Sequence, residues 1–361
     1  MICLACLIVL TFLGTLYQVD HGLHEAKAVY FDSYFVLLGG IIPFPGTQLV
    51  LGVLLVNLLG YLSQLLIAPT FKAGIVMIHL GLLMMLLGGA ITHHFAEESN
   101  LALQEGEGSN VSASYTDWEL ALIGLADPTT GARDIMAATL TGREAGGTIE
   151  FKDASTVVTI DEYYDNCRAF QARDVKDAPL SQVGITRLEA AKRELEPSDN
   201  IAGGIFTVKP GAGEPLRVLL FGEDAAPRTI ETAEGPYQIV LRRKRYPLPV
   251  FVSLTDFKRD MHPGTEMAKS YSSQVTVEAD GVARDVTISM NKPLRHRGYT
   301  LYQASFSEQQ SGAQTSVFAV TRNYGRLIPY VSTGIIVAGM ILHFLLMLFR
   351  RAGSIRQGVA S

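Results

Sequence analysis

Residues 327–349 read LIPYVSTGIIVAGMILHFLLMLF, an apolar run of 23 residues without a charged side chain. As an α-helix the run is about 34 Å long, enough to cross a hydrocarbon core of roughly 30 Å. It contains one imidazole, His343, and Arg350 and Arg351 follow it. An ionisable side chain inside a membrane helix costs free energy unless it contacts protein, water or a ligand. His343 is therefore either a structural histidine bonded to a neighbouring helix or part of a functional site, and this run alone favours neither.

Three further apolar runs lie near the start of the chain, at residues 2–17, 49–68 and 73–92. The last two are long enough to span a membrane, whereas the first is short and needs local thinning of the bilayer. No basic residue precedes the first run. It therefore stays open whether the start of the protein lies upstream of Met1.

The connection between the first two runs contains His21 and His24, which we expect in a loop. Residues 30–46 follow, with an aromatic stretch and then a short apolar stretch that ends at Pro43-Phe44-Pro45-Gly46. About seven apolar residues are too few for a span. We therefore predict that residues 30–46 form a short interfacial or re-entrant segment.

Residues 93–327 hold most of the charged side chains, and acidic residues outnumber basic ones there. This segment is predicted to be a soluble domain, and it lacks the basic excess with which proteins bind nucleic acid. Lys72 and three arginines within residues 350–361 lie beside the predicted spans. By the positive-inside rule they belong in the cytoplasm, so residues 93–327 are expected on the extracytoplasmic side of the plasma (inner) membrane.

Residues 93–327 are predicted to be mainly β. Short runs alternate polar and apolar residues between turn residues, as half-buried strands do, and Asp280-Gly281 predicts a hairpin turn. Residues 190–196 are charge-rich, and we expect one or two helical turns there. The predicted strands lie at residues 155–160, 204–209, 237–241, 273–278 and 284–289.

The predicted fold is a membrane protein with four transmembrane α-helices, three N-terminal and one C-terminal. The first three lie within residues 1–92, and the fourth spans residues 328–349. The large, mainly β extracytoplasmic domain of residues 93–327 is inserted between spans 3 and 4. Residues 350–361 form a cytoplasmic tail in this prediction.

The third span carries glycines at every seventh position, Gly74, Gly81 and Gly88, and they form a stripe where another helix can approach closely. His79 lies two residues before Gly81, about 200° around the helix, and so points away from the stripe. His79 is seven residues after Lys72, and His343 is seven residues before Arg350. The two imidazoles are therefore predicted at the same depth, where two neutral histidines suit the ligation of a metal centre such as haem iron.

The usual signatures of soluble enzymes are missing from the sequence, including a glycine-rich phosphate loop, a Gly-x-Ser-x-Gly motif and zinc-ligand spacings. Cys3 and Cys6 have the Cys-x-x-Cys spacing of redox motifs, but they lie in an apolar run instead of at a strand-to-helix turn. A redox membrane protein that uses these two thiols is one functional interpretation of the chain. Cys167 is the only cysteine outside the apolar runs.

The remaining histidines are weaker candidates. His93 and His94 lie where the third span ends, and we interpret them as interfacial residues, with ligation as the alternative. His262 and His296 are expected in loops of the β domain. His296 belongs to an Arg-His-Arg patch for which we favour a solvated surface over contact with a haem propionate.

A specific pattern occurs late in the β domain. Asn291-Lys-Pro-Leu294 is followed by Gly298-Tyr-Thr-Leu-Tyr-Gln-Ala-Ser305. Together with Tyr246-Pro-Leu-Pro-Val-Phe251 and the order of the predicted spans, this pattern resembles the ResB family (ResB/CcsB-type) of system II cytochrome c biogenesis. His79 and His343 also resemble the intramembrane histidines of that family. Residues 100–235 match far less distinctively.

The resemblance implies a subunit of a cytochrome c synthase, in which haem b is a transient substrate. With a ResC/CcsA-type partner, such a subunit carries haem across the membrane and aids its covalent attachment to apocytochrome c. The tryptophan-rich haem-handling motif of the partner is absent, because Trp118 is the only tryptophan. The chain is therefore expected to be a non-autonomous component of a holocytochrome c synthase (haem lyase).

In this interpretation His79 and His343 bind the haem iron, and Lys72 and Arg350 contact the propionates. It stays open whether the two histidines face each other or each faces the partner. The main alternative is a membrane-anchored extracytoplasmic binding or sensor protein in which the histidines are structural. Both interpretations place the chain in contact with membrane lipid.

Overall fold

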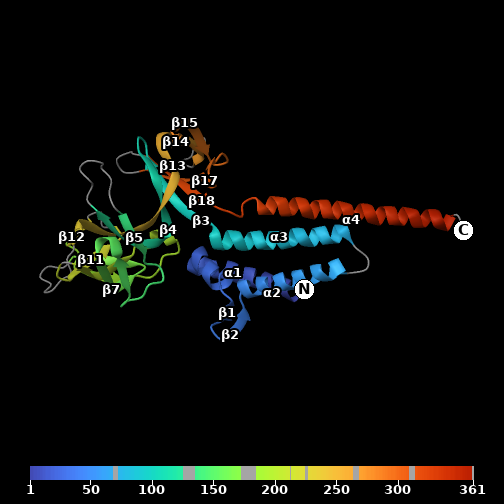
Figure 1. Cartoon of the computed structure of the whole chain (residues 1–361), viewed down its shortest axis with the longest axis horizontal. Coiled ribbons are helices and arrows are strands. Elements are labelled where there is room, and N and C mark those ends of the chain that lie inside the picture. Colours follow the sequence, from blue (N-terminus) through green and yellow to red (C-terminus); the bar gives the residue numbers. More distant parts are fainter. Residues whose placement is uncertain are drawn as a thin grey trace. The chain divides into compact units, whose positions relative to one another are not determined.

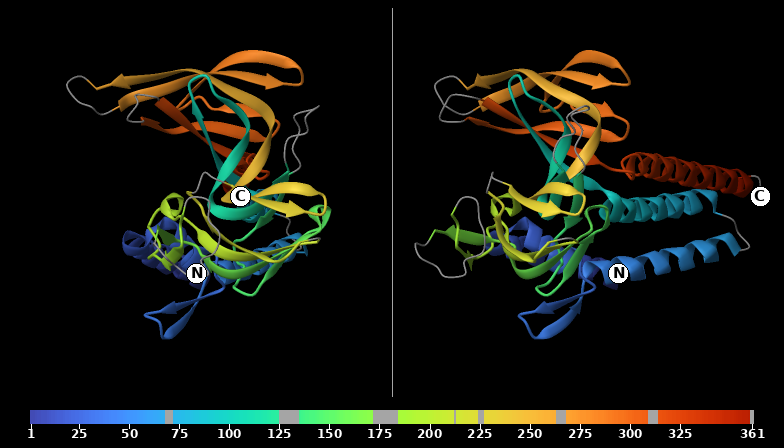
Figure 2. Two further views of the ribbon diagram at one scale, coloured as in Figure 1. Left: turned by 90° about the vertical axis from the view of Figure 1, so that its left-hand side faces the viewer. Right: turned by 60° about the vertical axis from the view of Figure 1, so that its left-hand side comes forward.

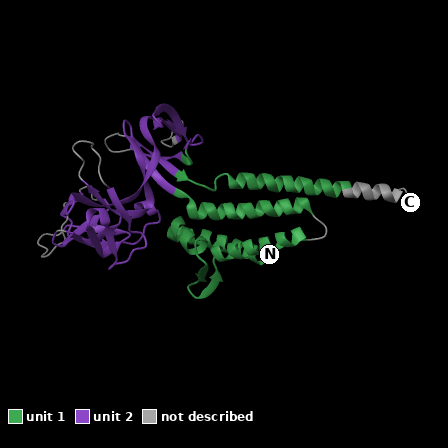
Figure 3. Cartoon of the chain, in the orientation of Figure 1, with its two compact units in different colours: residues 1–97, 297–300, 321–361 green, residues 98–296, 301–320 purple. Residues whose placement is uncertain are grey.

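A computed structural model describes residues 1–67, 72–124, 135–171, 184–211, 213–223, 227–262, 268–308 and 314–359. The chain forms two compact units, coloured separately in Figure 3. The first contains residues 1–97, 297–300 and 321–361, and the second contains residues 98–296 and 301–320.

The first unit contains the four long apolar helices. They are α1 (Ile2–Ala26), α2 (Thr47–Ile67), α3 (Ala73–Phe95) and α4 (Ile328–Val359), drawn in Figure 1. Each holds a segment that is long and apolar enough to cross a membrane. The predicted arrangement of three N-terminal helices and one C-terminal helix around a mainly β region is confirmed. Beyond Arg350, the backbone of α4 stays helical to Val359, where the sequence suggested only a tail.

Helix α1 is longer than predicted and contains a sharp break. His21 and His24 are helical, so their expected loop is wrong, and Gly22 between them has φ 80° and ψ 162°. This conformation lies outside the helical region and costs glycine little, since glycine has no Cβ. After the break, the π-helical segment η1 (Lys27–Phe31) returns along α1. The two segments touch at Gly14, where a Cβ would lie 2.9 Å from the ring of Phe31.

Helices α3 and α4 pack through the predicted glycine stripe, and Figure 1 shows them side by side and antiparallel. Gly74, Gly81 and Gly88 are the buried residues of α3. A Cβ on Gly74 would lie 2.6 Å from the backbone nitrogen of His343, and one on Gly81 would lie 2.9 Å from the carbonyl oxygen of Ser332. The backbones therefore touch along the stripe, as small residues permit in membrane helices.

The segment between α1 and α2 is a β-hairpin. Its strands β1 (Phe35–Leu38) and β2 (Ile42–Pro45) pair in antiparallel register. In Figures 1 and 2 it projects sideways from the helices. Residues 30–46 are thus too short to form a span, as predicted, and the hairpin is packed on α1 and α2 by one face.

The second unit is built of antiparallel strands. Its largest sheet of described strands has the order β15-β14-β13-β4-β3-β18-β17-β16, with β12 beside β13 and β5 beside β4. The long strand β13, yellow in Figure 2, pairs with β4 along one edge and with β14 along the other. The bounds are β3 (Glu97–Gln104), β4 (Gly108–Gly124), β5 (Ile135–Thr139), β12 (Arg228–Thr232), β13 (Gly235–Met261), β14 (Ala268–Ala279), β15 (Val282–Ser289), β16 (Leu294–His296), β17 (Tyr299–Glu308) and β18 (Gln314–Arg322).

Two smaller sheets complete this unit. One has the order β11-β10-β7-β6, and the other pairs β8 with β9. A core of buried side chains that includes Trp118, Leu120, Val158, Phe206 and Ile239 joins the four-stranded sheet to β4 and β13. The bounds are β6 (Thr148–Phe151), β7 (Thr156–Tyr164), β8 (Cys167–Phe170), β9 (Arg187–Ala190), β10 (Gly203–Pro210) and β11 (Leu216–Phe221), with short 3-10 turns η2 (Lys152–Ala154) and η3 (Pro197–Asp199).

The five predicted strand runs all overlap observed strands. The hairpin at Asp280-Gly281 is confirmed, since Ala279 pairs with Val282 and both turn residues have positive φ. The helical turns expected at residues 190–196 are wrong. Ala190 ends β9, and the only helical turn nearby begins at Pro197, whose ring fixes φ in the helical range.

Candidate functional site

His79 is the seventh residue of α3 and lies on the side opposite the glycine stripe. Its ring is half-buried, and its Nδ1 donates a hydrogen bond of 2.8 Å to the carbonyl oxygen of Ile75, one turn earlier. A neutral imidazole that donates from Nδ1 carries its lone pair on Nε2. This is the nitrogen that a metal-bound histidine with an anchored Nδ1–H presents to the metal.

The neighbour of this imidazole is Tyr61 of α2. The centroids of the two rings are 4.7 Å apart and their planes are tilted by 48°. Tyr61 is 43% exposed, so the ring also borders the outer surface of the helices. Sequence reasoning missed Tyr61, because a single aromatic residue in a span carries no signal until the facing helix is known.

His343 lies on α4 where α4 crosses the glycine stripe. Its backbone contacts the position of Gly74, and its half-buried ring packs against Phe344 with ring centroids 5.6 Å apart. Within the described residues, its imidazole has no hydrogen-bond partner. The structural alternative of a histidine bonded to a neighbouring helix therefore has no support in the described contacts.

The predicted equal depth of the two histidines is not found. His343 is level with Gly74, which precedes His79 by five residues, so the two Cα levels differ by about 7.5 Å at about 1.5 Å per residue. Side chains lean toward the N-terminus of their helix, and in this antiparallel pair the lean reduces the offset between the rings. The two histidines differ in depth because close packing on the glycines sets the register of α3 and α4. In this register the charged ends of the two helices are not level.

The two imidazoles are not brought together. His79 projects away from the stripe toward α2, whereas His343 lies on α4, which occupies the stripe. No cluster of three or more His, Cys, Asp or Glu side chains suited to a metal ion occurs among the described residues. Lys72 is exposed at the start of α3, and the side chain of Arg350 lies outside the described residues.

The histidines at the other end of α3 have local partners. His93 Nε2 is 3.5 Å from Asp32 Oδ1 and 3.1 Å from Gln48 Nε2, and Gln48 Nε2 also donates to the carbonyl oxygen of Phe31. His94 packs edge-on against His93. These contacts join α3 to η1 and the start of α2, which supports the interpretation of His93 as an interfacial structural residue.

His296 departs from the expected solvated patch. It ends β16, and its Nε2 is buried without a hydrogen-bond partner among the described residues. His262 lies just after β13, as expected for a residue outside the strands. Neither histidine belongs to a group of three or more His, Cys, Asp or Glu side chains that could hold a metal ion among the described residues.

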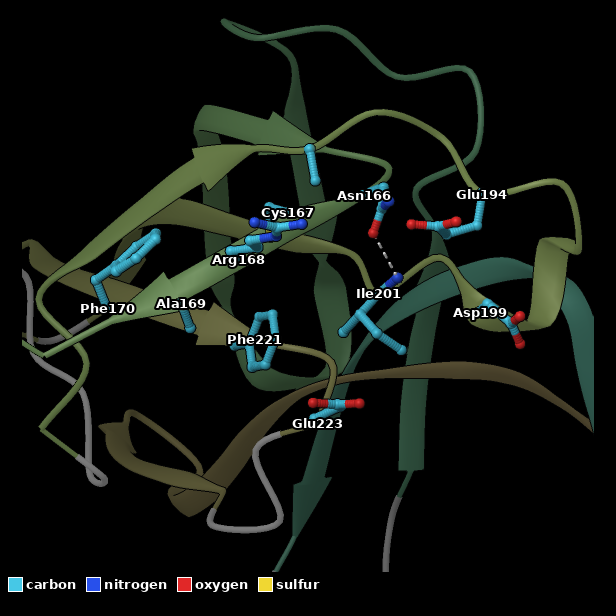
Figure 4. Close-up of a pocket in the computed structure, with 11 residues that line it drawn as sticks. Asn166, Cys167, Arg168, Ala169, Phe170, Glu194, Asp199, Ile201, Phe221 and Glu223 are labelled. Carbon is cyan, nitrogen blue, oxygen red and sulfur yellow. Dashed lines mark hydrogen bonds between the residues drawn. The ribbon is translucent and has the colours of Figure 1, made fainter.

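The β domain contains a cavity of about 470 Å³ beside β8, shown in Figure 4. Phe170, Ile201 and Phe221 supply apolar walls, and Glu194, Asp199 and Glu223 supply carboxylates. Cys167 also lines it, but burial raises the pKa of its thiol to about 11. The thiol therefore stays protonated at neutral pH and lacks the thiolate that a redox or nucleophilic cysteine needs.

Comparison with known proteins agrees with the pattern late in the β domain. Residues 234–321 match the ResB-like family. Protein NrfI of Wolinella succinogenes is 22% identical over 335 residues, which cover 92% of this chain and 32% of NrfI. Cytochrome c biogenesis protein CcsB of a Synechococcus species is 43% identical over 58 residues, 16% of this chain and 13% of CcsB.

The chain thus spans about a third of the length of NrfI. The matched family segment runs from the start of β13 to the end of β18 and includes the Asn291–Ser305 pattern. The resemblance to ResB proteins is confirmed.

Proposed function

We propose that this chain is the ResB-type subunit of a system II cytochrome c synthase. In this function it handles haem within the membrane, together with a ResC/CcsA-type partner, for attachment to apocytochrome c. Support comes from the ResB-like segment at residues 234–321 and from the similarity to a protein named for cytochrome c biogenesis. The four membrane-spanning helices supply the apolar surroundings that a haem macrocycle requires.

The observation that carries the proposal is the orientation of His79. Its Nδ1 is tied to the Ile75 carbonyl at 2.8 Å, so Nε2 is the nitrogen left to bind iron. The imidazole lies at a membrane depth where a polar group without a function is costly. Haem iron accepts an axial histidine nitrogen, and the half-exposed Tyr61 ring provides a flat surface beside it.

The partner supplies the opposite axial ligand in this proposal. Bis-histidine ligation within this chain requires His79 and His343 to face each other across a haem. The backbone contact between Gly74 and His343 leaves no space for a macrocycle between α3 and α4, and His79 lies on the other side of α3. His343 then contacts haem or the partner from the outer side of α4, where Phe344 is 65% exposed.

The remaining roles follow from this arrangement. Lys72, exposed at the end of α3 nearest His79, contacts a propionate, and Arg350 has the charge for the same task. The β domain lies on the extracytoplasmic side of the plasma membrane and positions the apocytochrome. Thioether formation there requires reduced haem and reduced apocytochrome thiols, and this chain contributes no thiolate of its own from Cys167.

The visible spectrum of the complex tests the proposal. The chain is co-expressed with its ResC/CcsA-type partner and purified in detergent, as wild type and as His79→Ala, His343→Ala and His94→Ala variants. We expect a Soret band in the wild type and the His94→Ala control, and loss of most haem from the His79→Ala variant. Added imidazole is expected to restore ligation there, because it replaces the missing axial nitrogen.

Two results would contradict the assignment. A colourless wild-type complex removes the haem function and leaves the membrane-anchored binding protein as the better interpretation. A His79→Ala variant with an unchanged Soret band and unchanged haem content shows that His79 is not a ligand. The His343→Ala variant separates a second haem contact from a packing residue, because only a haem contact changes the spectrum.

A further inference from the structure

The β1–β2 hairpin exposes large apolar side chains. Its tip consists of Gly39 and Gly40, whose φ values are 60° and 76°, followed by Ile41. Ile41 is 83% exposed, and Tyr34, Phe35, Leu37 and Ile42 are between 61% and 68% exposed. Contiguous exposed apolar groups of this kind mark a surface that contacts something other than water.

The opposite face of the hairpin is fixed to the helices. Val36 is 2% exposed and packs with Leu10 of α1 and Val50 of α2. Leu38 and Phe44 add partly buried contacts to the same cluster. Because side chains alternate along a strand, anchoring of this face directs Phe35 and Leu37 outward.

The charge pattern excludes several occupants of the exposed face. No Asp, Glu, Lys, Arg or His occurs between Asp32 and Lys72, a stretch that contains the hairpin and all of α2. The exposed face therefore offers no charged side chain to a charged protein surface or to a phosphate. It is continuous in sequence with α1 and α2, two helices that are apolar enough to span the membrane.

The edge of β2 excludes a strand from another protein. The backbone N–H of Gly46 donates to the carbonyl oxygen of Tyr34, and hydrogen-bonded pairs alternate with non-hydrogen-bonded pairs along an antiparallel ladder. Residues 36 and 44 therefore form the next hydrogen-bonded pair. Pro43 and Pro45, opposite Leu37 and Phe35, belong to the alternate pairs, which are not hydrogen-bonded. The backbone nitrogens of the alternate pairs point away from β1, and in proline they carry no hydrogen. This edge lacks donors, which blocks strand addition and removes part of the cost of placing a strand edge in an apolar medium.

We propose that the β1–β2 hairpin lies in the membrane interface, with Phe35, Leu37 and the tip residue Ile41 among the acyl chains of the lipids around α1 and α2. The anchored face sets its position against the helices. The glycine tip and the proline edge reduce the number of backbone groups that lose water. The carbonyl groups that remain require the hydrated interface instead of the centre of the bilayer. This inference does not depend on haem binding.

Tryptophan fluorescence in reconstituted vesicles tests the inference. Trp118 is the only tryptophan, so a second one is measured by difference from the wild type. The full chain is prepared as Ile41→Trp and as Val282→Trp, the control at the exposed β14–β15 turn. Both are placed in phosphatidylcholine vesicles whose acyl chains are brominated near the headgroup or near the methyl end.

For Ile41→Trp we expect short-wavelength difference emission and at least twofold quenching by the lipids brominated near the headgroup, with weaker quenching by the deeper label. For Val282→Trp we expect water-like emission without quenching. Long-wavelength emission of Ile41→Trp without quenching would overturn the inference, because the tip is then in water. Short-wavelength emission without quenching would also overturn it, because protein then covers the tip.

A second position guards against a local effect of the first substitution. Leu37→Trp, at a site that is 61% exposed, is expected to show the same pattern as Ile41→Trp. Quenching at Ile41 but not at Leu37 would overturn the proposed placement of the whole exposed face. Since no haem is present in these vesicles, either result leaves the proposed haem function untouched.

Discussion

Replacement of Gly74 by alanine tests whether α3 and α4 are held by backbone contact at the level of His343. A Cβ on Gly74 would lie 2.6 Å from the His343 nitrogen, 2.7 Å from the Gly339 oxygen and 2.7 Å from the His343 Cα. All three are backbone atoms of α4, so no flexible side chain can move aside. The two helices must separate by roughly 0.8 Å to restore an ordinary contact at this level.

The expected cost follows from a comparison with Gly60→Ala. Nothing lies within 4 Å of a Cβ at Gly60 on α2, so alanine there brings only its higher helix propensity, about 1 kcal/mol. Gly74 is the second residue of α3, so Gly74→Ala gains at most the same propensity and adds the strain of overpacking, about 1–3 kcal/mol. The difference between the two variants is therefore expected to be at least the packing term of about 1–3 kcal/mol.

Reversible unfolding in mixed detergent micelles measures this difference as a free energy of unfolding. We expect Gly60→Ala to be as stable as the wild type or more stable, and Gly74→Ala to be the less stable of the two variants. A difference below about 0.5 kcal/mol would refute the backbone contact, since that is the usual error of additivity. The exclusion of haem from the space between α3 and α4 would then lose its basis.

Three further outcomes are expected. Arg243 donates to five backbone carbonyl oxygens and stacks on Trp118, with 4.2 Å between its Cζ and the ring centroid. Arg243→Met is therefore expected to lower the free energy of unfolding of the β domain by about 3 kcal/mol in chemical denaturation, and an unchanged midpoint would contradict this. The pKa of Cys167 is raised from 9.0 to about 11, so at pH 8 its thiol holds about 100-fold less thiolate than an exposed cysteine does. Its alkylation rate, measured by mass spectrometry of its peptide, should therefore rise about tenfold per pH unit up to about pH 11, and a plateau near pH 9 would contradict the raised pKa. In the complex with the partner, Tyr61→Leu is expected to keep the Soret band and weaken haem retention several-fold, whereas loss of the band would make Tyr61 necessary for ligation.

The features that the sequence predicted correctly are set by local chemistry. Three of the four apolar runs are long enough to predict a span from hydropathy alone, and the first, at residues 2–17, was predicted as a short span that continues further as a helix in the structure. The seven-residue spacing of Gly74, Gly81 and Gly88 defines one face of a helix whatever packs on it. The Asp280-Gly281 turn was equally predictable, because few residue pairs accept positive φ at both positions.

The features that were missed depend on contacts between distant segments. Nothing near Gly22 in the sequence shows that the chain turns back along α1, since glycine is also frequent within membrane helices. The pairing of β3 with β18 across the whole second unit likewise joins segments far apart in the chain. Residues 190–196 have a helical composition, but the pairing of β9 with β8 holds Ala190, the first of them, in a strand.

The depth of the two histidines shows how a sound local count fails at the level of packing. The positive-inside rule places Lys72 and Arg350 at one membrane boundary, which predicts that His79 and His343 are level. The backbone contact at Gly74 places His343 level with a position on α3 that is five residues before His79. This contact sets the register because backbone atoms in contact tolerate less displacement than a long basic side chain, which reaches the boundary from several depths. A histidine pair inferred from charge spacing therefore needs the register of its helices before it can be assigned to one metal. In this chain His79 lies beside Tyr61 of α2, opposite the stripe that α4 occupies, so the proposed haem function is tested first by measuring what a partner adds to haem binding.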